Sequence, residues 1–518
     1  MNEKAIYTLL YHGTQHSELS GEFSFPDYLP DVRRVLRVIA TPHITGKYMN
    51  GERLELEGEI GMTLLYCSEE STVCTFGANL PFAQSIAIPG LDETAVITAK
   101  LNTDNTVCRL TGPRKCILRT KPSLHVRAAA KRDIAPDLSS LPSAEAAKLC
   151  IDTEDVTVSD LVCASHTDLR YAEDLSVGDG VIVSVLSCEV LPVIRECRAM
   201  TGCAVCKGEF AISALCTVQE EDGIVCRTLN RRVPFSETLH DPAMTESHRC
   251  EPDLTVTAVT PTITEEGRNL GVDFVCELAL LCSADIRIPV ITDAFLPSYD
   301  IRRKTEPYTV FRPLKTVFGA LSASDAIKFD AQDPPKTVTN VRMTAGFDRW
   351  EWKEGRIHFD GTLDISAICT GDDGKYLPYS HTVPLHWDTD AAGLPDAASL
   401  LIQTECGITG QNTRIDSSAG TVVCDAELSV FVSVCAKETQ EFPRTLSLPP
   451  DAKAYPPIKE PLIFCYPEKG ETVWDIAKRY RIPPMTICEA NGMEITSKIA
   501  EISPLVIPIH PIFSKMKA

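Results

Sequence analysis

Three stretches of the chain share one pattern, in which apolar residues alternate with polar or small ones. They span residues 54–82, 206–235 and 357–385, and each closes on a proline between two apolar residues. In the first stretch Ile60, Met62 and Leu64 hold alternate positions, as expected for a β-strand with one buried face. Turn-forming clusters at 68–71, 220–223 and 371–374 separate paired runs at hairpin length. The pattern therefore predicts three sets of β-hairpins.

The three stretches are copies of one long repeat. Each contains a glycine, Gly58, Gly208 or Gly361, and these glycines are 150 and 153 residues apart. An aspartate precedes each glycine by 27 to 29 residues: Asp31, Asp179 and Asp333. Solenoid repeats are only about 20–50 residues long. We therefore expect a mainly β chain of three tandem β-sandwich-like repeats, in which each glycine marks a bulge or a close strand crossing.

A different pattern occupies the C-terminal end. Thr472 and Asp475 have the spacing of a capping box. Apolar residues then follow at helical spacing, namely Val473, Ile476, Ala477 and Tyr480. Pro483 and Pro484 suit the start of a second helix, which Asn491 and Gly492 would end. With short strands at 463–466 and 505–509, the pattern predicts a small βααβ domain.

These patterns divide the chain into four domains and two linkers. The repeats are predicted at 1–135 (core 25–127), 150–303 (core 179–290) and 304–440 (core 333–440), with a linker at 136–149 and the βααβ domain at 462–511. The stretch 441–461 contains six prolines. Such a composition favours a semi-rigid polyproline spacer, which would hold the C-terminal domain clear of the repeats.

Charge narrows the choice of partners. The 518 residues carry a net charge of −21, which argues against nucleic acid or anionic lipid as the main partner. Residues 461–518 hold seven basic and six acidic residues, so residues 1–460 carry −22. The apolar stretch 5–11 is too short for a signal peptide. The longest apolar run, 181–194, contains Glu189 and is shorter than the roughly 20 residues of a membrane-spanning helix. We expect a cytosolic protein without a transmembrane segment.

The 21 cysteines do not suggest a secreted disulfide scaffold, because the chain is long and their number is odd. Buried, reduced thiols in apolar strands are the favoured interpretation. The alternative is a zinc or redox site at Cys203 and Cys206, with Cys197 nearby. A structural zinc site needs four ligands, usually two such pairs, and there is no second C-x-x-C motif. We therefore predict no metal.

Catalytic motifs are also missing from the sequence. It contains no G-x-x-x-x-G-K-[ST], G-x-S-x-G or H-E-x-x-H. The segment 371–375 is rich in glycine but reads as a hairpin turn. His381 and His386 lie near Asp388 and are more typical of solvated histidines than of a metal or acid–base site. Paired carboxylates of a glycosidase remain possible. We predict no enzymatic activity and no cofactor.

The C-terminal pattern resembles the LysM domain. Its characteristic run is matched by Gly470, Glu471, Thr472, Val473, Trp474, Ile476 and Ala477, followed by Asn491 and Ile507-Pro508. The resemblance implies binding of N-acetylglucosamine polymers through the loop after the first strand and the loop before the last. The turn at 501–504 departs from the family's Gly-Gln. The candidate partner- or glycan-binding residues are Gly470, Glu471, Thr472, Trp474, Asp475, Lys478, Asn491 and Ile495.

Two of the candidate features have alternative interpretations. Trp474 is either a core aromatic residue or a partly exposed binding residue. Lys478, Arg479 and Arg481 either form a solvated face or steer the domain to an acidic protein surface.

The repeats resemble the SPOCS domain of spore-coat proteins. The motifs P-D-V-x-x-V-L at 30–36 and G-E-I-G-M-T-L-L-Y at 58–66 carry the resemblance, which is clearest in the first repeat. The order of domains resembles SipL-like spore-coat morphogenetic proteins. It implies a non-enzymatic scaffold in the mother-cell cytoplasm, at the forespore surface, that binds stage IV sporulation protein A, the ATPase of the coat basement layer, and other coat proteins. In that family the LysM domain is implicated in binding this partner.

Two other functions remain open. One is a peptidoglycan-binding LysM protein, which would need exposure to the cell wall or cortex. The other is a cell-wall hydrolase, which LysM domains often accompany.

Overall fold

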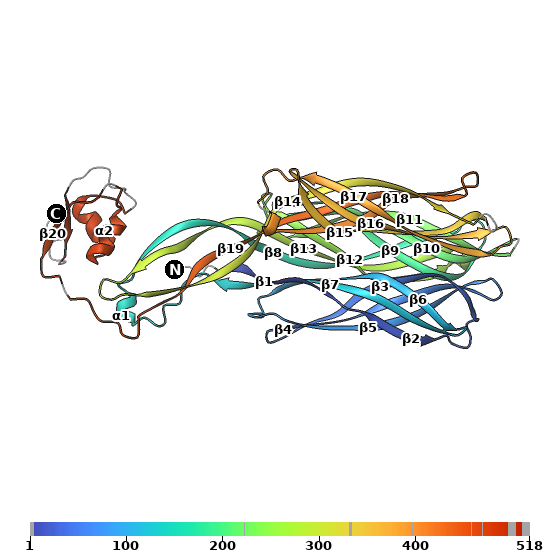
Figure 1. Ribbon diagram of the computed structural model, residues 1–518, viewed down its shortest axis with the longest axis horizontal. Helices are drawn as coiled ribbons and strands as arrows, with labels where there is room; N and C mark the ends of the chain where they lie inside the picture. The colour runs from blue at the N-terminus through green and yellow to red at the C-terminus, as the bar shows by residue number, and fades with distance from the viewer. Residues whose placement is uncertain are drawn as a thin grey trace.

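The computed structural model describes residues 5–221, 223–330, 334–395, 397–456, 458–468, 470–495 and 504–509. Most of these residues lie in long antiparallel strands. Three bundles of strands lie side by side at one end of an elongated molecule, and a small unit with helices lies at the other end (Figure 1). The predicted mainly β class is confirmed.

The first bundle is a sandwich of two sheets. A meander forms one sheet from β3 (Val32–Asn50), β4 (Arg53–Ser68) and β5 (Val73–Ala87). In the other sheet β7 (Lys115–Asp133) pairs with β6 (Val96–Gly112) and with two successive strands, β1 (Ala5–His16) and β2 (Leu19–Ser24). Ile60, Met62 and Leu64 are at most 1% exposed, so the alternating face lies in the core.

The other two sandwiches repeat this plan. In the second, the meander β9 (Val181–Met200), β10 (Cys203–Glu220) and β11 (Gly223–His240) faces β12 (Arg249–Thr264), β13 (Asn269–Phe295) and β8 (Cys150–Ser176). In the third, β15 (Pro335–Lys353), β16 (Arg356–Gly371) and β17 (Tyr376–Asp390) face β18 (Leu400–Asp416), β19 (Thr421–Ser447) and β14 (Arg302–Lys328). Short 3₁₀ turns, η1 (Glu265–Gly267) and η2 (Ala397–Ser399), lie in the second and third units.

The opening strand of each sandwich pairs with its last strand. The predicted cores at 25–127, 179–290 and 333–440 leave this strand out, because each core was taken from the repeated motifs. Of the three aspartates that precede the repeated glycines, Asp31 and Asp179 lie just before β3 and β9, and Asp333 lies outside the described residues.

The repeated glycines occupy matching positions where two strands come close. A Cβ atom on Gly58, Gly208 or Gly361 would lie 2.0–2.2 Å from a carbonyl oxygen of the neighbouring strand. In each sandwich the strand register shifts at or beside this point. The expected bulge or close strand crossing is confirmed at all three glycines.

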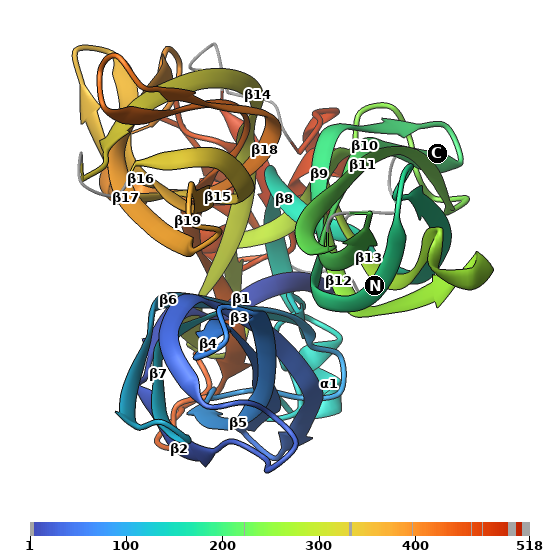
Figure 2. The ribbon, with the colours of Figure 1, turned by 90° about the vertical axis from the view of Figure 1, so that its right-hand side faces the viewer.

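The three sandwiches surround a common axis, as an end-on view shows (Figure 2). Apolar residues of all three form one shared cluster, which consists of Leu36, Ile39, Leu65, Cys67, Val73, Leu186, Leu215 and Ile368. A second shared cluster combines strands of all three units and contains Ile6, Val158, Ile288, Val290, Tyr308, Val310 and Phe442. Burial of apolar surface between the units therefore joins them into one body.

Polar contacts fix the packing of the sandwiches. Arg37 of the first is only 7% exposed and donates to Ser366 Oγ (2.8 Å), to the Ser366 carbonyl (2.6 Å) and to Asn340 Oδ1, all in the third. Burial, together with the nearby Arg342, lowers the pKa of Arg37 to about 10. Arg342 in turn forms a 2.9 Å ion pair with Glu189 of the second sandwich.

Four strands run beyond the sandwiches. β8, β13, β14 and β19 each contain 27 residues, a length of roughly 90 Å at about 3.3 Å per residue. They form two twisted ribbons that extend towards the C-terminal unit (Figure 1). The linker after the first sandwich, which contains α1 (Ser143–Ala146), pairs with the end of β19 through Asp137 and Thr445.

The C-terminal unit has the predicted βααβ order: β20 (Leu462–Cys465), α2 (Val473–Tyr480), α3 (Pro484–Asn491) and β21 (Leu505–Pro508). The spacer prediction was wrong in two respects. Strand β19 continues to Ser447 in register with Arg302, so residues 441–447 are paired strand. The unit also packs against a ribbon end and is not held clear of the repeats. None of the helices described is long and apolar enough to cross a membrane.

Candidate functional site

Helix α2 begins at the predicted capping box. The backbone N–H of Asp475 donates to Thr472 Oγ1 (3.2 Å), and the backbone N–H of Thr472 donates to Asp475 Oδ2 (2.9 Å). The hydrogen bonds from Thr472 lower the pKa of Asp475. Val473, Ile476 and Ala477 are fully buried. The cap and the apolar stripe thus hold α2 in place, with the two predicted site residues Thr472 and Asp475 serving as caps.

Asn491 connects α3 to the last strand. Its amide donates to the carbonyls of Ile487 (2.9 Å) and Val506 (2.7 Å), and its Oδ1 accepts from the Val506 N–H (2.8 Å). All these contacts lie within the unit. The structure therefore gives this predicted site residue a role in holding the fold.

Trp474 and Lys478 on α2 contact the end of β13. Trp474 Nε1 donates to Asp293 Oδ2 (3.0 Å), and Lys478 Nζ donates to the same oxygen (2.6 Å). The Phe295 ring meets Trp474 edge-on, with centroids 5.1 Å apart. Phe295 is 6% exposed and belongs to the hydrophobic core of the C-terminal unit. Trp474 is thus half-buried against the second sandwich's ribbon.

The basic side chains that were predicted to be either solvated or steering are engaged within the chain. Lys478 pairs with Asp293, and Arg479 pairs with Glu471. The Arg481 guanidinium stacks on the ring of Tyr455. Tyr455 belongs to the spacer, and its hydroxyl donates to Asp300. The contacts of Lys478 with Asp293 and of Tyr455 with Asp300 attach the unit and the spacer to the body, whereas the Arg479–Glu471 pair lies within the unit.

The remaining predicted site residues are spread over the unit. Gly470 forms a turn with φ +93°, and Glu471 accepts from the Glu468 N–H (2.8 Å). Ile495 is 44% exposed. The loop before β21 lies outside the described residues from 496 to 503, so the unusual turn at 501–504 is described only at Pro504.

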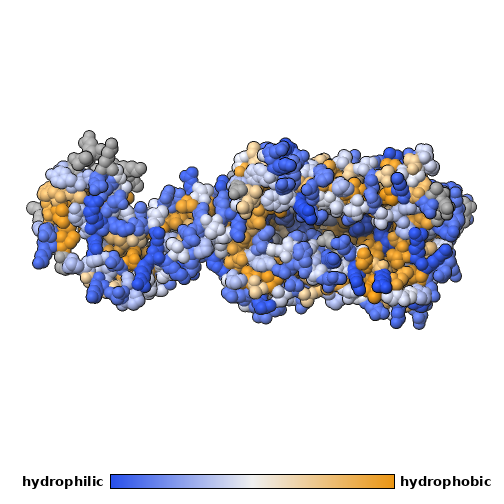
Figure 3. Space-filling view, in the orientation of Figure 1, coloured by the Kyte–Doolittle hydropathy of each residue, from blue (hydrophilic) through white to orange (hydrophobic). Residues whose placement is uncertain are grey.

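An apolar face of the unit was missed by sequence reasoning. Phe464 and Tyr466 are 62% and 68% exposed. Phe464 pairs with Val506, which places both on the outer face of the two-stranded sheet. Hydrophobic residues gather on the surface of this end of the molecule (Figure 3). The alternation along β20, with Ile463 and Cys465 inward, is the signal that could have identified the face.

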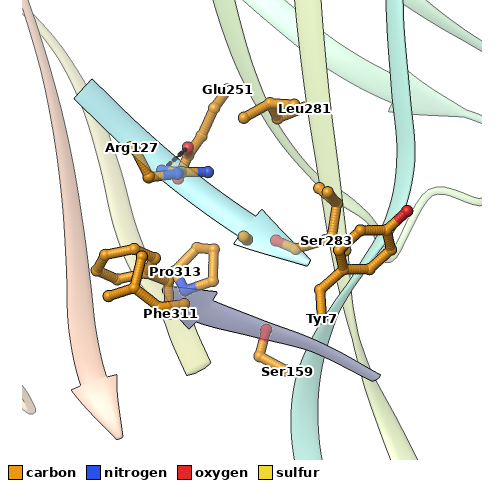
Figure 4. Close-up of a pocket in the computed structure, with 11 residues that line it drawn as sticks. Tyr7, Arg127, Ser159, Glu251, Leu281, Ser283, Phe311 and Pro313 are labelled. Carbon is orange, nitrogen blue, oxygen red and sulfur yellow. Dashed lines mark hydrogen bonds and ion pairs between the residues drawn. The ribbon is translucent and has the colours of Figure 1, made fainter. Parts of the chain in front are cut away.

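A small cavity lies where the three sandwiches meet (Figure 4). It has a volume of about 40 Å³ and is lined by β1, β7, β8, β12, β13 and β14. Its main polar contact is an ion pair of 2.9 Å between Arg127 and Glu251. A cavity of this size has room for only a few water molecules. A larger hollow of about 320 Å³ on β8, β12 and β13 has Arg170, Thr260 and Asp273 as polar lining residues.

His381 and His386 do not share a site. They are five positions apart on β17, so their side chains point to opposite faces. His381 pairs with Asp325, His386 pairs with Asp360, and Asp388 pairs with Arg356. Both histidines are more than half exposed, which agrees with solvated side chains. The segment 371–375 forms the predicted hairpin turn, with Gly374 N–H donating to the Gly371 carbonyl (3.1 Å).

Cys203 and Cys206 cannot act as a pair, because residues three apart on a strand point to opposite faces. Both lie on β10, and Cys206 is fully buried. Within the described part of the chain, no group of three or more histidine, cysteine or acidic side chains is arranged so that it could hold a metal ion.

Two comparisons connect these units to known families. A family model described as "SipL, SPOCS domain" matches residues 31–111, which covers β3 to β5 and most of β6. A model of the LysM domain matches residues 468–508, which contain both helices and β21. Curated proteins and solved structures gave no match. Both matched domains are non-catalytic binding domains. The chain therefore combines a SPOCS domain of the SipL type, in its first sandwich, with a C-terminal LysM domain.

Proposed function

We propose that this protein is a non-enzymatic scaffold of the spore coat. In this proposal the LysM unit binds stage IV sporulation protein A, the ATPase of the coat basement layer, and the β-sandwich body serves as its platform in the mother-cell cytoplasm, at the forespore surface. The SPOCS and LysM matches support a coat-associated role in sporulation. Other coat proteins would bind the body.

The observation that carries the proposal is the apolar outer face of the LysM unit. Its aromatic side chains Phe464 and Tyr466, at the sheet of the unit, are 62% and 68% exposed. Exposed aromatic residues are common hot spots of protein interfaces. Trp474 and Lys478 already contact Asp293. The outer face is therefore the better candidate surface for a protein partner.

The test is capture of the purified ATPase by the full chain. Replacing both aromatic residues, Phe464→Ser with Tyr466→Ser, should weaken binding by about tenfold or more, as expected for loss of a hot spot. Tyr28→Ser is the matched control, because Tyr28 is 83% exposed on the first sandwich. Removal of residues 461–518 should abolish capture. Undiminished capture by the double variant or by the shortened chain would contradict the proposal.

Peptidoglycan binding is the second candidate, because the LysM match favours a glycan ligand. It would use the loop around Gly470 and Glu471 after β20. Sedimentation with purified peptidoglycan separates the two functions. A glycan-binding protein should sediment with it and should tolerate the Phe464→Ser and Tyr466→Ser changes, whereas the proposed scaffold should stay in the supernatant.

A further inference from the structure

Four thiols from four different strands meet inside the second sandwich. We call them the thiol cluster: Cys197 on β9, Cys206 on β10, Cys250 on β12 and Cys282 on β13. The Sγ atoms of Cys197 and Cys206 are 2.7 Å apart, and those of Cys250 and Cys282 are 3.3 Å apart. Cys197 and Cys250, which lie on the two facing sheets, pack in the same hydrophobic core, and Cys250 helps to raise the pKa of Cys197. The cluster thus joins both layers of the sandwich.

The strand pairing places each close pair directly opposite. Cys197 faces Cys206 across β9 and β10, and Cys250 faces Cys282 across β12 and β13. Directly opposite residues on antiparallel strands have Cα atoms about 4.5–5.5 Å apart. This separation lies within the range of about 4.4–6.8 Å that a disulfide spans. A bond between either pair would therefore need little movement of the backbone.

The cluster differs from a zinc site in its spacing. Two cysteine ligands of a tetrahedral zinc, each about 2.3 Å from the metal, have sulfur atoms about 3.8 Å apart. The Cys197–Cys206 contact is more than 1 Å shorter, at 2.7 Å. Direct sulfur–sulfur chemistry suits this pair better than metal binding.

Access and reactivity differ within the cluster. Cys206 and Cys282 are fully buried, whereas Cys197 is only half-buried, so a reagent reaches Cys197 first. Hydrogen bonds from Cys197 and Cys282 lower the pKa of the Cys250 thiol. Contact with Cys206 and burial raise the pKa of Cys197, so Cys197 reacts first because of its access and not because of its acidity.

We propose that the second sandwich is a site of thiol oxidation, at which a small-molecule disulfide converts Cys197 and Cys206 into a cross-strand disulfide bond. In the first step Cys197 loses its proton to solvent, and its Sγ attacks the small disulfide to form a mixed disulfide, while the thiolate that leaves takes up a proton. In the second step Cys206 Sγ attacks the Cys197 sulfur and releases the second small thiol. The two cysteines lose two electrons and two protons, and the small disulfide gains both and becomes two thiols.

The new bond would close the β9–β10 hairpin close to its turn at residues 201–202. It would constrain the unfolded chain and so raise the resistance of the second sandwich to unfolding. Oxidation would leave the LysM surface and the strand pairing unchanged, because the two sulfur atoms are already in contact.

The experiment uses the full chain, purified under reducing conditions. The protein is then exposed to increasing ratios of hydroxyethyl disulfide to its reduced form, 2-mercaptoethanol. Remaining thiols are alkylated in denaturant, and the linked peptides are mapped by mass spectrometry. We expect the Cys197–Cys206 bond to form at a lower ratio of disulfide to thiol than any other bond among the 21 cysteines. The melting temperature should rise by several degrees when this bond forms.

Two variants test the assignment. Cys197→Ser should abolish this first bond and the rise in melting temperature. Cys203→Ser is the matched control, because Cys203 lies on the same hairpin and its side chain points away from Cys206. This control should leave the Cys197–Cys206 bond and the rise in melting temperature unchanged. The proposal is overturned if other cysteines link first in the wild-type chain, if Cys197 bonds to Cys250 in place of Cys206, or if the purified protein holds one zinc ion that protects the four thiols.

Discussion

The contact between the LysM unit and the body can be tested by changing Asp293. This carboxylate accepts hydrogen bonds from Trp474 (3.0 Å) and Lys478 (2.6 Å), and Asp293→Ala removes both. The indole bond contributes about 1 kcal/mol. The side chains of Asp293 and Lys478 are 34% and 50% exposed, so solvent screening limits the ion pair to about 1 kcal/mol or less. The change should therefore weaken docking by up to about 2 kcal/mol, which is up to about 30-fold in the ratio of docked to undocked unit.

Limited proteolysis of the spacer at 448–461 is a suitable assay. Tyr455 in this segment contacts Asp300 and Arg481, so the spacer is protected as long as the unit is docked. When opening is fast relative to cleavage, the cleavage rate follows the open population. The Asp293→Ala rate should therefore exceed the wild-type rate by up to about 30-fold. Asp285→Ala is a matched control on the same strand, where Asp285 pairs with Arg249.

Docking of the LysM unit should also depend on pH. Burial opposes ionisation of Asp293, but the hydrogen bonds from Lys478, Trp474 and the Ala294 N–H outweigh it and lower the pKa of this carboxyl. A carboxyl with a lowered pKa stabilises the docked state above its ordinary pKa of about 4 and loses this contribution as the pH falls through the lowered value. The difference in cleavage rate between the wild-type protein and Asp293→Ala should therefore shrink in strong acid. Equal cleavage rates of the two proteins at neutral pH would refute the docking contact.

Three further changes test the fold. Gly58→Ala forces a Cβ to within 2.2 Å of a backbone oxygen, whereas a Cβ on Gly61, in the same strand, meets its nearest atom at 3.6 Å. Chemical denaturation should therefore show a loss of about 1–3 kcal/mol in the free energy of unfolding for Gly58→Ala but not for Gly61→Ala. Arg37→Leu leaves the acceptors of Arg37 in the third sandwich unpaired, so the free energy of unfolding should fall by about 2–4 kcal/mol and the unfolding midpoint with it. An unchanged midpoint would show that this contact does not hold the sandwiches together. Asn491→Ala should raise amide exchange throughout residues 462–495, and Glu489→Ala, on the exposed side of the same helix, should not.

Local features of the fold could be predicted from the sequence because local residues determine them. The capping box of Thr472 and Asp475 lies within one helical turn, and the alternation of Ile60, Met62 and Leu64 marks one face of a strand. The repeated glycines could be interpreted for the same reason: a backbone that comes within 2.2 Å of a would-be Cβ excludes every other residue.

The contacts that position the candidate site could not be predicted in this way. Trp474 bonds to Asp293, 181 residues earlier in the chain, and no periodicity indicates such a pair. Alternation is also the same in a strand that belongs to a sandwich and in one that continues as a free ribbon, so the lengths of β8, β13, β14 and β19 were not foreseen. The C-x-x-C spacing was misleading because Cys203 and Cys206 lie in a strand, where the true neighbour of Cys206 is Cys197.

The arrangement of the body favours a scaffold that presents one surface in a fixed direction. Buried polar contacts from Arg37 and two shared apolar clusters join the three sandwiches, so the ribbons emerge from a rigid base. The LysM unit packs its Trp474 side onto one ribbon, while Phe464 and Tyr466 stay exposed on its sheet. A unit on a free tether would present these aromatic residues in all orientations, at a cost in entropy on binding. A docked unit has already lost that freedom, and the docking contact with Asp293 therefore contributes to the affinity for a partner that it does not touch.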